Sequence, residues 1–123
     1  MEVNKIQELI DEYYYWDMRV NKLQCDYFAD EIRLVYGDTE GYDVIYKFTG
    51  CYKANFEHTP NYEKEKAVKD MSLMQIPYFM QDVEVGEIIK ESIKFYTCKI
   101  NMFPLYLEIW CKNIQVIKKK RVE

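Results

Sequence analysis

The 123-residue chain is 49% hydrophobic, is rich in tyrosine and has a net charge of −4. This length predicts one domain, residues 1–123, with enough apolar material for its own core, and the net charge argues against a general nucleic-acid binder. No apolar run is long enough to cross a bilayer and the N-terminus lacks the pattern of a secretory signal, so we expect a cytoplasmic protein without membrane contact.

The acidic residues are concentrated in the first half of the chain. Residues 1–61 contain 12 acidic and 6 basic residues, whereas residues 62–123 contain 9 acidic and 11 basic residues. An acidic half is typical of a protein with a basic partner, and it is also compatible with an ordinary solvated surface.

The four cysteines do not form a metal-binding pattern. Cys25, Cys51, Cys98 and Cys111 contain no C-x-x-C pair, and His58 is the only histidine that could complete a site with them. Two disulfides would be possible in an oxidising compartment, but without an export signal we expect free thiols that behave as small buried apolar groups. We therefore expect no metal and no cofactor.

The N-terminal segment is predicted to form a short amphipathic helix over about residues 5–13. Asn4 could cap it, with Gln7 three residues later, and a helix this short needs its apolar stripe buried, so we expect it to lie across a sheet. The apolar residues that recur at spacings of three and four are Val3, Ile6, Leu9, Ile10 and Tyr13. We expect Trp16 to anchor the core where the helix meets the sheet.

Three segments then show the alternation of β-strands: residues 19–25, 31–36 and 42–52. Turn-forming residues separate them at 26–30 and 37–41, which indicates successive hairpins. Gly50 and Cys51 interrupt the third run, so a bulge or bend is expected there before residues 52–56 continue the strand.

Residues 59–92 are less regular. Thr59 and Pro60 could open a helix, so residues 62–70 are predicted to be a loop or a short surface helix. Pro77 would confine a strand to an edge, alternation resumes at Val83 and Val85, and residues 87–92 are expected to turn into the next strand.

Residues 94–120 hold the most regular pattern of the chain. Apolar residues alternate on both sides of Phe103-Pro104, which predicts two strands joined by a tight connection. Near Asn113 the apolar positions shift from odd to even, which predicts a bulge or bend. Altogether we expect an α+β fold: a mainly antiparallel sheet of about six strands, as a meander or curved sandwich, with a short N-terminal helix packed on it.

No catalytic motif stands out. Cys51 and His58 could meet with an acid such as Asp43, but no sequence signature supports that triad, and the glycines form no phosphate-binding loop. The basic run at residues 118–121 is expected to fray in solvent at the terminus.

The remaining candidate is an acidic surface decorated with tyrosines. Such a surface suits the occlusion of a basic groove, because complementary charge speeds encounter and aromatic anchors slow release. The alternative is that the tyrosines, Tyr36 and Tyr46 included, are partly buried in the sheet and the acids only cover its turns. The candidate contact residues are Asp26, Tyr27, Asp30, Glu31, Asp38, Glu40, Tyr42 and Asp43.

Several stretches of the chain resemble a known group of proteins. Residues 25–31 (CDYFADE), 46–52 (YKFTGCY), 75–79 (QIPYF), 99–102 (KINM) and 107–111 (LEIWC) are similar to small proteins of Bacillus-type genomes. These are encoded beside large polymorphic toxins with variable C-terminal domains, and they look like the immunity proteins of such contact-dependent systems. Trp16-Asp17 and residues 114–116 are also similar to β-rich immunity families.

The resemblance implies a protein that is not an enzyme and binds one cognate toxin domain, commonly a nuclease, blocking it by stoichiometric occlusion. It carries no individual contact residue over to this chain. Two other functions remain open: a small-molecule or enzymatic pocket near Cys51 and His58, and a structural protein that self-associates as a homodimer through the edge of the strand over residues 105–117.

Overall fold

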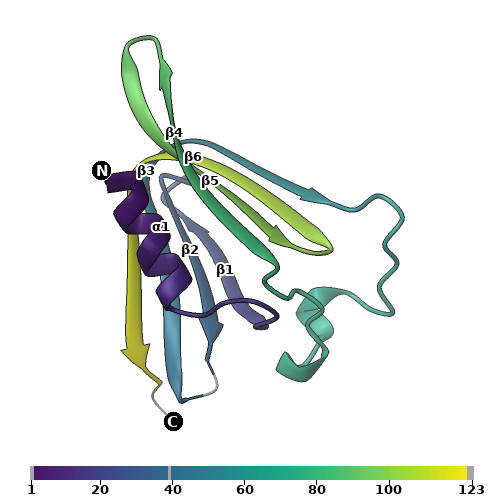
Figure 1. The fold of residues 1–123 in the computed structure, drawn as a ribbon. Coiled ribbons are helices and arrows are strands. Elements are labelled where there is room, and N and C mark those ends of the chain that lie inside the picture. The colour runs from purple at the N-terminus through teal and green to yellow at the C-terminus, as the bar shows by residue number, and fades with distance from the viewer. Residues whose placement is uncertain (1, 39, 122–123) are drawn as a thin grey trace.

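The computed structural model describes residues 2–38 and 40–121 and shows one α-helix and one antiparallel sheet (Figure 1). The sheet order is β1-β2-β3-β6-β5-β4, which confirms the expected α+β class with a mainly antiparallel sheet and an N-terminal helix. The elements are α1 (Glu2–Glu12), β1 (Val20–Asp26), β2 (Glu31–Gly37), β3 (Tyr42–His58), β4 (Asp82–Lys90), β5 (Ile93–Met102) and β6 (Leu105–Lys120).

The two longest strands, β3 and β6, hold the sheet together. They pair with each other from Tyr42↔Lys120 to His58↔Leu105. The first part of β3 also pairs with β2, and the first part of β6 also pairs with β5. The sheet thus has two halves, β1-β2-β3-β6 and β3-β6-β5-β4, and each long strand belongs to both.

Strands β3 and β6 bend at the same place, near the pairs Thr49↔Asn113 and Cys51↔Cys111. The sheet therefore curves around its core (Figure 1). In β6 the buried positions pass from Cys111 to Ile114, which confirms the predicted change of face at Asn113. In β3, Gly50 has a φ of +63, and a Cβ there would lie 2.9 Å from the Lys112 side chain. The register then shifts between Cys51 and Lys53, which confirms the irregularity predicted at Gly50 and Cys51.

The segment before β4 returns to the start of β1. The Val20 amide donates to the Tyr78 carbonyl at 2.8 Å and the Met80 amide donates to the Met18 carbonyl at 2.8 Å. This contact brings both ends of the sheet order together around the apolar interior. The largest fully buried side chains are Tyr36, Tyr46, Phe48, Ile10, Ile32, Leu34, Met80, Ile100, Met102, Ile109, Val44 and Pro104.

Helix α1 covers the edge of β4. Ile10 is fully buried, and the Gln7 side-chain amide donates to the Val83 carbonyl at 3.0 Å and accepts from the Val85 amide at 2.8 Å. Gln7 thus satisfies two backbone groups that an edge strand would otherwise leave unpaired. The helix begins at Glu2, so Asn4 lies inside it and the predicted cap at Asn4 is wrong.

The structure corrects the prediction that Trp16 anchors the core. Trp16 is 55% exposed, whereas Tyr13 and Tyr15 pack against the core. Trp16 lies in a turn closed by the Met18 amide, which donates to the Tyr15 carbonyl at 2.9 Å, and in this turn the Trp16 side chain is exposed to solvent.

Two boundaries also differ from those predicted. Strand β3 continues to His58, and the Thr59 amide donates to the Pro104 carbonyl at 2.9 Å instead of opening a helix. The segment that follows contains only two short 3-10 turns, Val68–Asp70 and Leu73–Gln75. Strand β4 extends to Lys90, because the hairpin with β5 turns through Glu91 and Ser92, both at positive φ. Among the described residues, no helix is long and apolar enough to span a membrane.

Replacing Gln7 with Ala should lower the free energy of unfolding by about 1–3 kcal/mol, because two backbone groups of β4 lose their partner. Urea denaturation measures this change, and hydrogen exchange at the Val85 amide should accelerate. The exposed Lys5→Ala variant on the same helix is the control and should change stability by less than about 0.5 kcal/mol. Equal effects of the two substitutions would contradict the role assigned to Gln7.

Candidate functional site

The structure divides the eight predicted contact residues between two turns at opposite ends of β2. Asp26, Tyr27, Asp30 and Glu31 belong to the β1–β2 turn region, and Asp38, Glu40, Tyr42 and Asp43 belong to the β2–β3 turn region. A seven-residue strand rising about 3.3 Å per residue separates the two groups by about 20 Å. They do not form one continuous patch.

The β2–β3 turn is built around Asp38. Its carboxylate accepts from the amides of Glu40 and Tyr42, each at 2.9 Å, and lies 3.5 Å from the Lys118 ammonium. Desolvation raises the pKa of Asp38, but the two amides and Lys118 outweigh it and hold that pKa below its usual value. Asp38 therefore has a structural role in this turn.

The basic C-terminal run closes against the same turn. Lys118 and its neighbours are paired in β6, and the Arg121 guanidinium donates to the Asp43 carboxylate at 3.1 Å and to the carbonyls of Asp38 and Tyr42. The prediction that this run frays in solvent is wrong, because its charges meet the acids of the turn.

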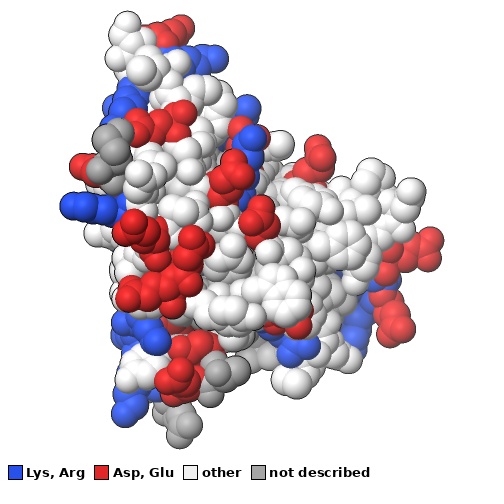
Figure 2. All heavy atoms as spheres, in the orientation of Figure 1, with Lys and Arg blue, Asp and Glu red and all other residues white. Residues whose placement is uncertain are grey.

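A cleft of about 220 Å³ lies between the C-terminal end of α1 and the β2–β3 turn. We call it the acidic cleft, since Glu12, Asp38 and Glu40 supply three of its side chains and Lys118 is its only basic residue among those described. Figure 2 shows acidic side chains gathered over the C-terminal half of α1 and toward the end of the sheet near the C-terminus. Its lining residues are Glu12, Tyr13, Tyr14, Met18, Asp38, Glu40, Val44 and Lys118.

Helix α1 supplies this acidity at an electrostatic cost. Glu8 and Glu12 lie four residues apart on one helix face, Asp11 is beside them, and the last turn carries no basic residue. Acidic side chains at a helix C-terminus oppose the helix dipole, and like charges at this spacing repel. Asp11 accepts a hydrogen bond from the Gln7 side-chain amide at 3.1 Å, whereas Glu8 and Glu12 have no hydrogen-bond partner or ion pair among the described residues.

The β1–β2 turn forms a second exposed feature. Tyr27 is 72% exposed and Phe28 is fully exposed at its tip. Asp26 accepts hydrogen bonds from Gln24, and Glu31 lies 3.7 Å from Lys47. Asp30 is exposed, and no ion pair involves it among the described residues.

Tyr36 and Tyr46 belong to the core. Their rings meet edge to face at 5.7 Å between centroids, and the Tyr36 hydroxyl donates to the Tyr13 carbonyl at 2.7 Å. Burial raises the pKa of Tyr36 to about 12. For these two tyrosines the alternative of burial in the sheet was right.

The hypothetical Asp43–Cys51–His58 site is not assembled. All three residues lie on β3 at intervals of eight and seven residues, so an extended strand holds them more than about 20 Å apart in each step. The His58 Nε2 atom instead lies 2.8 Å from the Tyr78 hydroxyl, and burial raises the pKa of the Cys51 thiol to about 11.

The cysteines are free thiols in different environments. Cys98 and Cys111 are buried and Cys25 is exposed, so the expectation of burial was wrong for Cys25. Burial raises the pKa of Cys111 to about 12. Within the described residues, no group of three or more His, Cys, Asp or Glu side chains could hold a metal ion.

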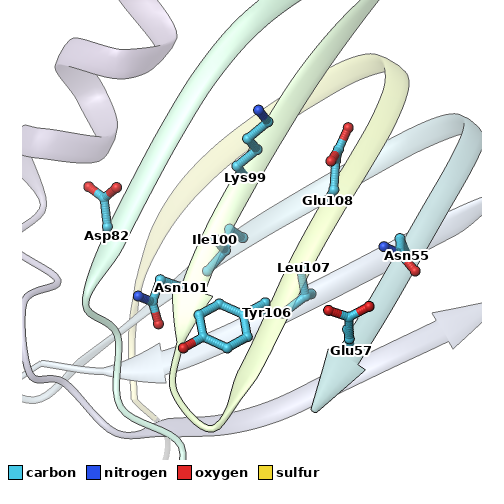
Figure 3. A pocket seen from close by; sticks show the side chains of 9 residues that line it. All are labelled: Asn55, Glu57, Asp82, Lys99, Ile100, Asn101, Tyr106, Leu107 and Glu108. Carbon is cyan, nitrogen blue, oxygen red and sulfur yellow. The ribbon is translucent and has the colours of Figure 1, made fainter. Parts of the chain in front are cut away.

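An open groove of about 330 Å³ crosses the outer face of β3, β6, β5 and β4 (Figure 3). On neighbouring strands, Lys99 lies opposite Glu108 in the register and Asn101 lies opposite Tyr106. These side chains offer hydrogen bonds on a solvated sheet face. The groove is lined by Asn55, Glu57, Asp82, Lys99, Ile100, Asn101, Tyr106, Leu107 and Glu108.

The edge predicted for self-association is covered over part of its length. Strand β6 is central in the sheet and pairs with β5 over residues 105–111 and with β3 along its whole length. Residues 112–120 pair with β3 on one side and have no strand on the other side, where β5 pairs with residues 105–111.

Comparison with known families decides what kind of protein carries these surfaces. The family model described as Immunity protein PIM7 matches residues 2–118. The chain belongs to this immunity protein family. A search of curated proteins finds no match to the sequence. The match confirms the resemblance to immunity proteins of polymorphic toxin systems, so the role of this PIM7 member is toxin neutralisation through binding of a cognate toxin.

Two residues of the acidic cleft of this PIM7 member, Glu12 and Tyr14, were not among the predicted contact residues. Glu12 and Tyr14 line it with Asp38 and Glu40, but they are distant in the chain. The absence of a basic residue from the last turn of α1 was visible in the sequence and could have indicated an exposed acidic helix end.

Replacing Asp38 with Asn should lower the free energy of unfolding by about 1 kcal/mol at pH 7, because hydrogen bonds to a charged acceptor become neutral ones. The folded-state pKa of Asp38 is depressed, so its stabilisation is present above the unfolded pKa of about 3.9 and is lost as the pH falls through the folded value. Urea denaturation from pH 7 to pH 3 should therefore show the two proteins converging in acid. Glu63→Gln serves as the exposed control, and a difference that is independent of pH would contradict the role of the charge.

Proposed function

We propose that this PIM7 member neutralises its cognate toxin domain in the cytoplasm by forming a stoichiometric complex, without catalysing a reaction. The toxin in this proposal is a nuclease, and the acidic cleft with the acidic end of α1 covers its basic substrate groove. Residues 1–123 act as one domain in this role.

The main support for this proposal is the negative charge at the C-terminal end of α1. Glu8, Asp11 and Glu12 lie in the C-terminal half of the helix, where its dipole disfavours acids, and among the described residues no ion pair neutralises them. Local rules of this kind are commonly broken where function requires it. A nuclease groove must attract nucleic-acid phosphates, so it presents the positive potential that this surface complements.

Exposed aromatic residues beside the cleft support a protein partner. Tyr14 lines the cleft and is 58% exposed, and Trp16 is 55% exposed two residues later. Large aromatic side chains are enriched at the centre of protein interfaces because they bury much apolar area with few rotatable bonds. We therefore assign Tyr14 and Trp16 to the contact surface.

Co-expression with the toxin domain encoded beside the gene should rescue growth and yield a co-purifying one-to-one complex. Growth arrest together with no complex would contradict the proposal. Addition of the purified protein to the toxin domain in a nuclease assay should inhibit it stoichiometrically, whereas substoichiometric inhibition would indicate catalysis.

The double charge reversal Glu12→Lys with Glu40→Lys should raise the Kd of this complex by about tenfold at low salt, mainly through a slower association rate. Raising the salt concentration should shrink the difference, since these charges are exposed and screened. Surface plasmon resonance at two salt concentrations measures both effects.

The matched control for this experiment is Glu63→Lys with Glu65→Lys. These two exposed glutamates lie in the loop between β3 and β4, so the control changes the net charge equally but away from the cleft. A similar loss of affinity in both double variants would mean that net charge matters and the cleft does not.

A further inference from the structure

The tip of the β1–β2 hairpin has an unfavourable backbone for its sequence. Tyr27, Phe28 and Ala29 have φ values of 53, 58 and 68, and the Asp30 amide donates to the Tyr27 carbonyl at 3.1 Å. Positive φ at both central residues of such a turn is the type I′ pattern, which strongly favours Asn-Gly. Phe28 and Ala29 occupy these positions instead.

The exposure of the tip adds a second cost. A bulky residue at positive φ is strained by its Cβ, and Phe28 recovers nothing by burial because it is fully exposed. The β4–β5 turn also has two residues other than glycine at positive φ, but Glu91 and Ser92 are polar, so their exposure leaves no aromatic ring in water. The Tyr27–Ala29 turn thus has an unfavourable backbone conformation and also exposes an apolar ring to water.

The base of the hairpin holds this tip in place. The Cys51 amide donates to the Asp30 carbonyl at 3.1 Å, which ties the turn to β3. Asp26 accepts hydrogen bonds from the Gln24 amide at 2.9 and 3.0 Å. An aromatic side chain fixed in an exposed position loses little further freedom when it is buried in a complex.

The charge around the tip indicates the kind of partner. Residues 25–31 contain Asp26, Asp30 and Glu31 and no basic residue. An apolar pocket with basic residues at its rim would bury the rings and face the carboxylates. A basic toxin domain has the charge that this arrangement requires.

We propose that Tyr27 and Phe28 form an aromatic anchor that inserts into an apolar pocket of the cognate toxin domain, with basic residues of that domain facing Asp26 and Asp30. This inference rests on the proposed function, and it adds a contact at the opposite end of β2 from the acidic cleft. An interface of ordinary size buries about 800 Å² on each partner, which is broad enough to include both features.

The test separates strain from contact with two substitutions in the same turn. Phe28→Asn removes the ring and suits positive φ, so it should raise the Tm by about 2–4 °C and raise the Kd for the adjacent-gene toxin domain at least tenfold. Ala29→Gly relieves the same backbone but keeps the ring, so it should raise the Tm similarly and leave the Kd within about twofold of wild type. Phe28→Tyr, which keeps an aromatic ring, should bind like wild type.

The outcomes distinguish this inference from the proposed function. If wild type binds the toxin domain and Phe28→Asn binds equally well, the anchor is overturned and the proposed function stands. A lower Tm for both Phe28→Asn and Ala29→Gly would overturn the strain argument. If wild type does not bind the toxin domain, the proposed function fails and the anchor fails with it.

Discussion

The pairing of β3 with β6 supports every other part of this molecule. The two strands share one bend, at Gly50 in β3 and beside Asn113 in β6, and the bend turns both halves of the sheet toward a common interior. Without it a six-stranded sheet would remain open and would leave one face of each half in water. Gly50 makes the bend possible because its positive φ and its close approach to Lys112 leave no space for a side chain.

Helix α1 links the scaffold to the acidic cleft. Its apolar side buries Ile10, and Gln7 satisfies the edge of β4, while its exposed end contributes Glu12 to the acidic cleft. The basic C-terminal run neutralises Asp38 and Asp43 but does not reach the acids of the helix. The net acidity of the cleft therefore comes from Glu12 on the helix and Glu40 in the β2–β3 turn.

Two exposed features of the chain depart from local physical rules. Acidic residues crowd the end of α1 that repels them, and aromatic residues occupy a turn that favours Asn-Gly. In the interior, the Tyr36 hydroxyl is hydrogen-bonded and the helix satisfies the edge of β4, whereas the buried Tyr46 hydroxyl has no hydrogen-bond partner among the described residues. Under the proposed function, partner binding accounts for these two surface features.

The sequence by itself determined the fold class, the helix, most strand positions and the change of face at Asn113, because period and turn chemistry are local properties of the chain. It also suggested the family through short stretches of resemblance. Only the tertiary structure decided which turns share a surface: it placed Asp30 and Asp38 at opposite ends of β2 and brought Glu12 beside Glu40. It also turned Trp16 outward and fixed Arg121 on Asp43. These outcomes depend on contacts between residues far apart in the chain, which no local pattern encodes.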